Sequence, residues 1–417
     1  MNALRIAGMV LMACTTAAAV AADPTSALTF EEVAQRTLAS RPEFRRFAIE
    51  RRAMDARREL AALRPAIELG IEAEGLAGTG DYRGVDSAEL GLSLGTVFER
   101  GGKRTGRIEV ADRAADLMRV EQRVEALDLL AETGRRFIDV AVAAERITLA
   151  EQAFEQATRT VDLVRPRVNA ARAPRTELLN AEIALTAARL ARAAAGRELE
   201  SAQMRLASQW GASLERPTVT ASLRETAAPK SYSELESELA KLPDLARFAS
   251  ERALRDAEAR LVRAQRSADW RTSIGVRRYE ASGDQALMFS WSMPLGSAAR
   301  NAPAEREAAA VAEGSDLRLE ATASSLRSTL FRQLQLLEVA RERLIAIGEE
   351  DLPRAREALV LTERGYRIGR FPYRELSLVQ AQVIDLQLAQ LDAAAAYHTT
   401  YIEIERLTGA RLALIPE

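Results

Sequence analysis

Side chains that commonly perform catalysis or bind metal ions are scarce in this sequence. Its 417 residues include one histidine, His398, and one cysteine, Cys14. The stretch around the histidine, AAAAYHTTYIE, is helix-forming, and no Cys/His cluster has the spacing of a metal site. Neither a P-loop nor a GxGxxG motif is present. The sequence therefore predicts a protein that is not an enzyme, with no cofactor and no resident metal, in which His398 is an ordinary helix residue.

The segment YRIGRFPYRELSLVQAQ (366–382) has instead the composition of a binding surface. Gly369 and Pro372 stand inside a helix-forming region, where glycine commonly ends a helix and proline suits the first turn of the next one. A tight turn between two helices is expected, and it carries aromatic residues beside arginines in a chain that is only 5% aromatic. Aromatic rings and arginine are enriched in binding hot spots. We interpret this turn as a docking surface; the alternative is that its rings only pack the turn.

The composition of the whole chain favours long helices. Apolar residues make up 47% and charged residues 28%, with few Gly and Pro. The formal net charge of −2 gives no argument for a nucleic-acid partner. After residue 22 no run of 18 apolar residues occurs, which argues against a membrane-spanning helix.

The first 22 residues, MNALRIAGMVLMACTTAAAVAA, have the pattern of a secretory signal. Arg5 supplies the positive start, an apolar run follows, and AVA offers a small-residue cleavage site. We favour cleavage near Ala21 or Ala22. Because LMAC resembles a lipoprotein box, lipidation of Cys14 is the alternative. Either route leaves no pair of thiols for an intramolecular disulfide.

The chain contains two related halves. Residues 42–60 and 243–261 are identical at nine positions that lie 201 apart, and ARAPRTEL (171–178) matches GRFPYREL (369–376) at an offset of 198. Two matches in the same order at nearly the same offset indicate an internal repeat. We therefore predict a signal peptide (1–22), a first repeat (23–212), a linker (213–232) and a second repeat (233–417).

Each predicted repeat has the same internal order. A helix (about 30–64 and 233–267) precedes two short segments in which apolar and polar residues alternate, and a long helical hairpin follows. Alternating segments on either side of turn residues predict β-hairpins. The predicted strands cover about 66–76, 87–97, 270–280 and 286–295, and the helical hairpins cover about 102–212 and 302–408. A heptad seam begins at Leu117 and predicts coiled-coil packing, and Pro353 predicts a kink.

The four predicted strands have the length of transmembrane β-strands. Four strands are too few to close a barrel, so several chains would have to share one. The residues expected on the lumen face are mostly polar, as a water-filled interior requires: Glu68, Glu72, Glu89, Ser93, Ser290 and Ser292.

This doubled plan resembles the TolC family of outer-membrane efflux channels. Within the family, ERGGKRTGRIEVADRAAD (99–116) and GYRIGRFPYRELSLVQAQ (365–382) resemble the cobalt–zinc–cadmium branch. The resemblance implies a mainly α fold with a small membrane β part, in which a homotrimer builds a twelve-stranded barrel above a helical tunnel. It also implies a location in outer-membrane lipid, extending into the periplasm, with a periplasmic adaptor protein and an inner-membrane resistance–nodulation–division pump as partners. The implied cargo is divalent heavy-metal cations, which would leave passively; drugs or other small organic compounds are the alternative cargo.

The resemblance also assigns roles to the two turns, as periplasmic tips of the helical hairpins. The docking candidates are Arg172, Pro174, Gly369, Arg370, Phe371, Pro372 and Tyr373. Family tips carry an acidic residue six positions after the turn glycine, which implies Glu177 and Glu375 as gate residues. They would pair with Arg370, Arg374 or Arg175, unless they only complement the helix dipole.

Two departures from the family pattern set the repeats apart. The second repeat has GSAARNAPAE (296–305) in place of the GGKR stretch, and Ala171 stands where the second turn has Gly369. A left-handed cap costs more without glycine, so we expect the two turns to differ in shape.

The alternative function is a periplasmic coiled-coil adaptor or scaffold without a membrane barrel, which the doubled plan fits poorly.

Overall fold

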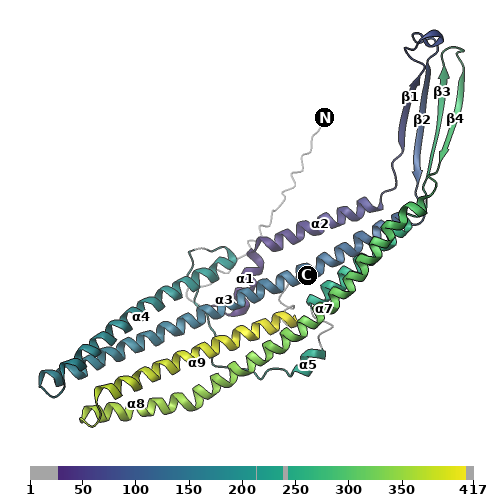
Figure 1. Ribbon diagram of the computed structural model, residues 1–417. Coiled ribbons are helices and arrows are strands. Elements are labelled where there is room, and N and C mark those ends of the chain that lie inside the picture. Colours follow the sequence, from purple (N-terminus) through teal and green to yellow (C-terminus); the bar gives the residue numbers. More distant parts are fainter. Residues whose placement is uncertain (1–26, 213, 238–242, 410–417) are drawn as a thin grey trace, which may run out of the picture.

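The computed structural model describes residues 27–212, 214–237 and 243–409. The predicted signal segment, with Cys14, lies outside these residues. The molecule is elongated, with a β-sheet at one end and helical hairpins running away from it (Figure 1). In chain order the elements are α1 (Phe30–Ser40), α2 (Pro42–Ala62), β1 (Glu68–Glu74), η1 (Gly80–Tyr82), β2 (Glu89–Phe98), α3 (Lys103–Asn169), α4 (Arg175–Ala207), η2 (Ser208–Trp210), α5 (Tyr232–Ser237), α6 (Pro243–Ala264), β3 (Trp270–Tyr279), β4 (Gln285–Ser292), α7 (Ser297–Ala346), the π-helical turn η4 (Ile347–Asp351), α8 (Leu352–Arg367) and α9 (Tyr373–Thr408).

The first helix of each repeat differs from the prediction. We predicted a single helix over about 30–64, and this is wrong. The helix is interrupted at Arg41, whose backbone is extended with ψ 131°. A residue that precedes proline is driven out of the helical region, and proline fits the first helical position. Pro42 accordingly starts α2, and Pro243 starts α6 at the matching place in the other repeat. The proline that both repeats share thus marks the start of a helix in each of them.

The long helices form the body of the molecule. With 67 residues, α3 spans about 100 Å. The buried side chains of its middle part include Val124, Leu127 and Ile138, which belong to the predicted heptad seam. At the predicted kink, Pro353 lies at the start of α8 directly after the π turn η4. Proline lacks the N–H that an α-helix needs, and a π turn is one way to accommodate the interruption.

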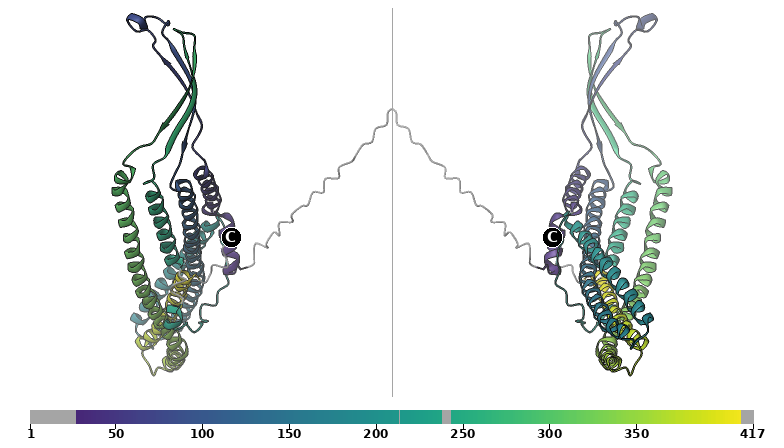
Figure 2. Two further views of the ribbon diagram at one scale, coloured as in Figure 1. Left: turned by 90° about the vertical axis from the view of Figure 1, so that its right-hand side faces the viewer. Right: turned by 90° about the vertical axis from the view of Figure 1, so that its left-hand side faces the viewer.

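The four strands form one antiparallel sheet in the order β1-β2-β3-β4. Figure 2 shows the sheet standing beyond the ends of the helices, with no helix laid against it. Cross-strand pairs such as Ile71↔Leu92 and Leu92↔Val276 place the apolar residues on one face. That face is open: Ile71 is 69% exposed and Phe289 is 74% exposed. An apolar face of this extent requires a covering medium or partner.

Candidate functional site: the hairpin tips and the polar face of the sheet

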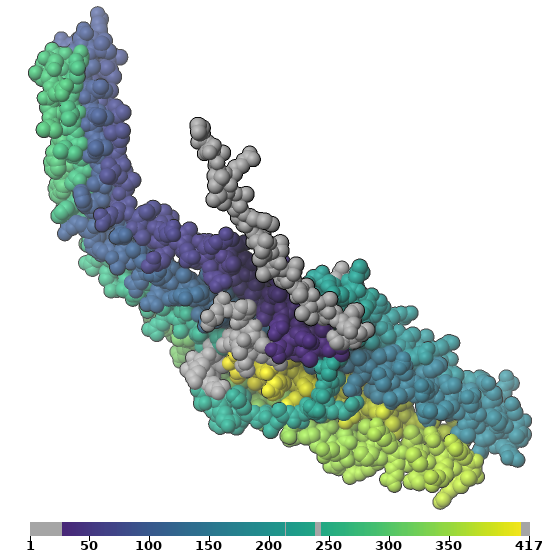
Figure 3. Space-filling model, turned by 180° about the vertical axis from the view of Figure 1, so that it is seen from behind, coloured from purple at the N-terminus to yellow at the C-terminus, as the bar shows by residue number. Residues whose placement is uncertain are grey.

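The two helical hairpins end side by side, at the end of the molecule opposite the sheet (Figures 1 and 3). In one turn Ala171 has φ 56°, and in the other Gly369 has φ 81°. The closing hydrogen bonds correspond: the amide of Arg172 donates to the carbonyl of Arg167, and the amide of Arg370 donates to the carbonyl of Gly365, each at 2.8 Å. The expectation that the turns differ in shape is therefore wrong. Ala171 accepts the left-handed conformation despite its Cβ.

The aromatic residues of the second tip lie mostly inside the chain. Tyr366 is 1% exposed and Tyr373 is 6% exposed, and their rings meet edge to face at 6.4 Å. Both belong to an apolar cluster with Val164 of α3 and Leu376 of α9. Tyr373 was predicted to present its ring at the surface, and this is wrong because the first turn of α9 directs that ring toward the neighbouring hairpin.

Polar contacts connect the two hairpins at their tips. The Tyr366 hydroxyl donates a hydrogen bond to Glu177 Oε2 at 2.9 Å. Arg167 Nη1 donates to the carbonyl oxygens of Tyr366 at 2.7 Å and Arg367 at 3.1 Å, and its guanidinium lies 4.7 Å from the centre of the Tyr366 ring. These carbonyls belong to the last turn of α8, where helical partners are missing. We call Tyr366, Glu177 and Arg167 the tip latch.

Further along the hairpins, two side-chain hydrogen bonds continue the connection. Gln380 donates to Thr160 Oγ1 at 3.0 Å, and Gln156 donates to Glu363 Oε1 at 2.8 Å.

Burial raises the pKa of Tyr366 well above its ordinary value, and the hydrogen bond to Glu177 raises it further. The Tyr366 hydroxyl therefore keeps its proton at physiological pH and remains a donor.

The gate candidates have different surroundings from those predicted. Glu177 is half-buried and bonds to Tyr366. Glu375 and Arg374 are exposed. In the described part of the chain, no ion pair joins Glu177 or Glu375 to Arg370, Arg374 or Arg175, so the predicted acid–arginine pairs are not present within one chain.

The docking candidates divide into exposed and packed residues. Arg172, Pro174, Gly369, Arg370 and Pro372 are exposed at the tips. Phe371 is half-buried, and its ring lies over Gly365: a Cβ on that glycine would come within 2.2 Å of Phe371 Cδ2.

Ile368 was not singled out from the sequence. It is 75% exposed beside Gly369 and is the large apolar side chain that this turn offers to solvent.

The polar face of the sheet centres on Arg277 of β3. Its guanidinium pairs with Glu89 at 2.9 Å and with Glu72 and Glu74 at 3.2 Å. Register pairs Glu72 with Gly91 and Gly91 with Arg277, so a glycine separates the two charged residues. Because Gly91 has no side chain, Arg277 can reach across β2 to the glutamates of β1. Sequence reasoning named Glu72 and Glu89 but missed Arg277.

Within residues 27–212, 214–237 and 243–409, no helix is both long and apolar enough to cross a membrane. The same ranges hold no group of three or more His, Cys, Asp or Glu side chains that could bind a metal ion. His398 packs edge-on against Tyr397 at 5.1 Å, and its Nε2 lies 3.0 Å from the carbonyl oxygen of Leu223.

Comparisons with known proteins cover most of the chain. The family model described as outer membrane efflux protein matches residues 33–212. The cobalt-zinc-cadmium resistance protein CzcC of Cupriavidus metallidurans is 25% identical over 313 residues, which cover 75% of each chain. The nickel and cobalt resistance protein CnrC of the same organism is 30% identical over 299 residues, or 70% of each chain. The chain belongs to the outer membrane efflux protein family.

The solved structure of the outer-membrane channel OprN gives the fold of this efflux protein independently. It superposes with a TM-score of 0.77 at 18% identity, covering 91% of this chain and 89% of that one. The predicted TolC-like fold, mainly helical with a small antiparallel sheet, is thus confirmed. As a member of this family the protein resides in the outer membrane.

The stretch that resembled the metal-resistance branch (99–116) has a clear structural position in this efflux protein. It runs from the end of β2 into the first turns of α3, and Gly101 and Gly102 both have left-handed backbones. Lys103 pairs with Asp269 at 2.7 Å, and the amide of Arg100 donates to the same carboxylate at 3.0 Å. Asp269 comes from the second repeat, so this motif joins the two repeats where sheet meets helices.

Proposed function

We propose that the protein is the outer-membrane channel of a tripartite efflux system and gives divalent heavy-metal cations a passive exit path. The observation that carries this proposal is the likeness to CzcC and CnrC over at least 70% of the chain. Both relatives are named for resistance to metals that form divalent cations. The likeness to OprN supports only the fold, so it gives no support for organic compounds as cargo. Transport of this kind needs no chemistry from the chain, and we assign it no catalytic role.

We divide the chain into a signal peptide (1–22), two repeats (23–212 and 233–417) and a linker (213–232). The repeated order of proline-started helix, β-hairpin and long helical hairpin supports this division. The family sequence match ends at residue 212, the end of the first repeat.

We propose further that three chains assemble around one axis. Among the described residues no strand pairs with the outer edges of β1 and β4, and an unpaired edge requires a partner or a protecting device. Pairing β4 of one chain with β1 of the next, three times over, would close a barrel of twelve strands. Its apolar face would meet lipid, and its polar face, with Arg277 and its three glutamates, would line the lumen.

In this arrangement the tips would face an adaptor protein in the periplasm, and the adaptor would connect them to a resistance–nodulation–division pump. Exposed Arg172 and Arg370 supply charge, and Ile368 with Phe371 supplies apolar area. Arginine and apolar anchors are suited to a compact interface. Tyr373 is buried, so the proposed contact surface does not include its ring.

We propose that the tip latch holds the tunnel closed between transport events. It joins α8 of one hairpin to α3 and α4 of the other, so the tips cannot separate without breaking it. Glu375 and Arg374, which are exposed near the same end, remain candidates for contacts between chains.

The proposed function is tested by deleting the gene and restoring it in trans. We expect the deletion strain to lose resistance to cobalt, zinc, cadmium or nickel and the restored strain to regain it, with trimers recovered from the outer membrane. Sensitivity only to organic drugs would overturn the metal cargo. Recovery of a monomer from the periplasm without detergent would overturn the channel itself.

A further inference from the structure

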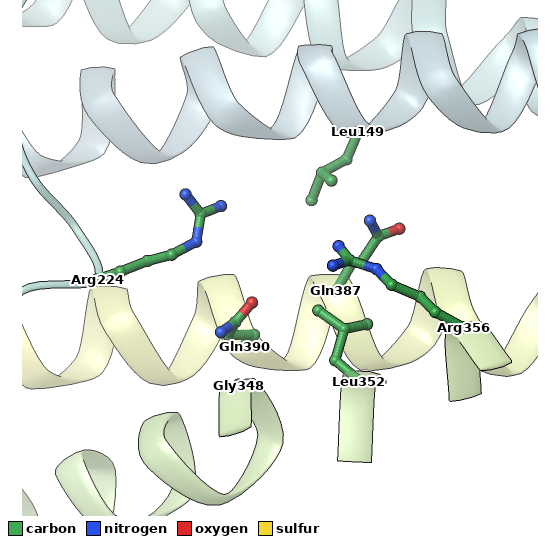
Figure 4. Close-up of a pocket in the computed structure, with 7 residues that line it drawn as sticks. All are labelled: Leu149, Arg224, Gly348, Leu352, Arg356, Gln387 and Gln390. Carbon is green, nitrogen blue, oxygen red and sulfur yellow. The ribbon is translucent and has the colours of Figure 1, made fainter. Parts of the chain in front are cut away.

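A cavity of about 420 Å³ lies between the hairpins, away from the tips and the sheet. Figure 4 shows Arg224 of the linker and Arg356 of α8 reaching into it from opposite sides, with Leu149 of α3 above. Gln387 and Gln390 of α9 complete the wall that faces the two guanidiniums. Cationic and amide donors thus converge on one space from three separate parts of the chain.

Most hydrogen-bond donors that line this cavity have no acceptor within the described chain. Arg224 pairs with Glu145 at 2.6 Å. Within the described chain, Arg356, Gln387 and Gln390 have no side-chain hydrogen bond or ion pair. Glu145 compensates the charge of Arg224, whereas the guanidinium of Arg356 has no carboxylate partner within the described chain and gives the cavity wall a positive charge. Arginine forks match the oxygens of carboxylate and phosphate groups, and amide N–H groups can donate to the same oxygens.

The π turn contributes to the shape of the cavity. Gly348 belongs to η4, and a Cβ at this position would lie 2.5 Å from Gln390 Nε2. Glycine therefore leaves the room that the Gln390 amide occupies at the wall. π turns are frequent at functional sites, and this one places Gly348 and the start of α8 against the cavity.

We propose that this cavity binds a phosphate group, free or on a small monoester. Several donors from different directions fit a tetrahedral oxyanion better than a halide, and the volume exceeds that of a single ion. A lipid headgroup is a poor source: 46 helical residues separate Leu149 from the start of α3 beside the sheet, about 70 Å. A bound phosphate would bridge Arg224 and Arg356 and so fasten the linker to the second hairpin.

The proposal is tested on the purified full-length protein by calorimetric titration at constant ionic strength in chloride. Inorganic phosphate and glycerol phosphate are titrated separately. We expect saturable binding of at least one of them, with a tenfold or greater loss of affinity in Arg356→Gln. Arg354→Gln is the matched control, because Arg354 lies on the same helix, is 70% exposed and pairs with Glu350. It should bind within twofold of wild type.

Two results would overturn the site: no saturable binding of either compound, or equal affinities in wild type and Arg356→Gln. Arg356→Lys keeps the charge but loses the fork, and it is measured beside Arg356→Gln in case the larger change disturbs folding. Intermediate affinity supports the site, and unchanged affinity in both variants counts against it. Failure here leaves the efflux function untouched, since the binding assay does not depend on transport.

Discussion

The two hairpin tips share a backbone shape but carry different side chains. Both turns have a left-handed residue closed by equivalent hydrogen bonds, although one uses Ala171 and the other Gly369. The first hairpin supplies the charged members of the tip latch, Arg167 and Glu177, whereas the second supplies the aromatic Tyr366. The comparison teaches that the repeats keep a common geometry while the contact between them needs complementary, unequal chemistry.

The largest expected effect concerns the aromatic side of this contact. Tyr366→Ala removes a fully buried ring and should weaken the tip by about 3–5 kcal/mol. Val168 holds the equivalent place 198 positions earlier and is only half-buried, so Val168→Ala should cost about 1 kcal/mol or less. Hydrogen exchange measures both effects, at the end of α8 and the start of α9 for Tyr366→Ala, and at the end of α3 and the start of α4 for Val168→Ala. Equal losses would show that the tips do not differ as described.

Tyr366→Phe isolates the hydroxyl of the latch. It keeps the ring but leaves Glu177 without its donor, and a hydrogen bond to a charged group contributes about 1.5–3 kcal/mol. We expect a higher open-channel conductance in planar bilayers and a lower melting temperature. Tyr373→Phe is the control, since within the described residues the Tyr373 hydroxyl makes no hydrogen bond. If the two variants conduct alike, the latch does not hold the tunnel closed.

Exchanging the turn residues tests the shared backbone. Gly369→Ala introduces a Cβ at φ 81°. The nearest atom to that Cβ would be Arg167 Nη2 at 3.9 Å, an ordinary contact distance, so the expected cost of about 1 kcal/mol comes from the backbone conformation. Ala171→Gly relieves the same strain and should stabilise by up to about 1 kcal/mol. Thermal melting should therefore shift in opposite directions. Shifts of the same sign would contradict the equivalence of the turns.

The smallest expected effect concerns the contacts that each repeat makes with the linker. Glu200 of α4 pairs with Arg216 at 2.7 Å, while His398, 198 positions later, contacts the Leu223 carbonyl. Burial lowers the pKa of His398, so the folded protein favours the neutral ring. Its contribution to stability is present above the ordinary value of about 6.5 and is lost as pH falls through the lower folded-state pKa.

Thermal melting across that pH range measures the effect of the histidine. We expect the melting temperature to fall less steeply with decreasing pH in His398→Gln than in wild type. Glu200→Gln, which alters the matching contact of the first repeat, should leave the histidine-dependent slope in place. A slope that is unchanged in His398→Gln would exclude this residue as its source.

The fold was predictable where one local pattern determined the structure. Alternation in the strands, as at Ile71 and Leu92, separated an apolar from a polar face, and the register preserves that separation. The break at Pro42 was equally local, but it was overlooked because the surrounding residues all favour helix. The site was less predictable, since its hydrogen bonds join residues far apart in sequence, such as Glu177 and Tyr366.

The sequence by itself determined the elements of this protein: periodicity specified strands and helical seams, and glycine and proline specified the turns. Only the tertiary structure decided which side chains meet. Whether Tyr373 faces solvent or the other hairpin depends on how two helices are placed beside each other, and helix propensity carries no information on that placement. The same holds for Arg277, whose reach to Glu72 depends on Gly91 occupying the strand between them.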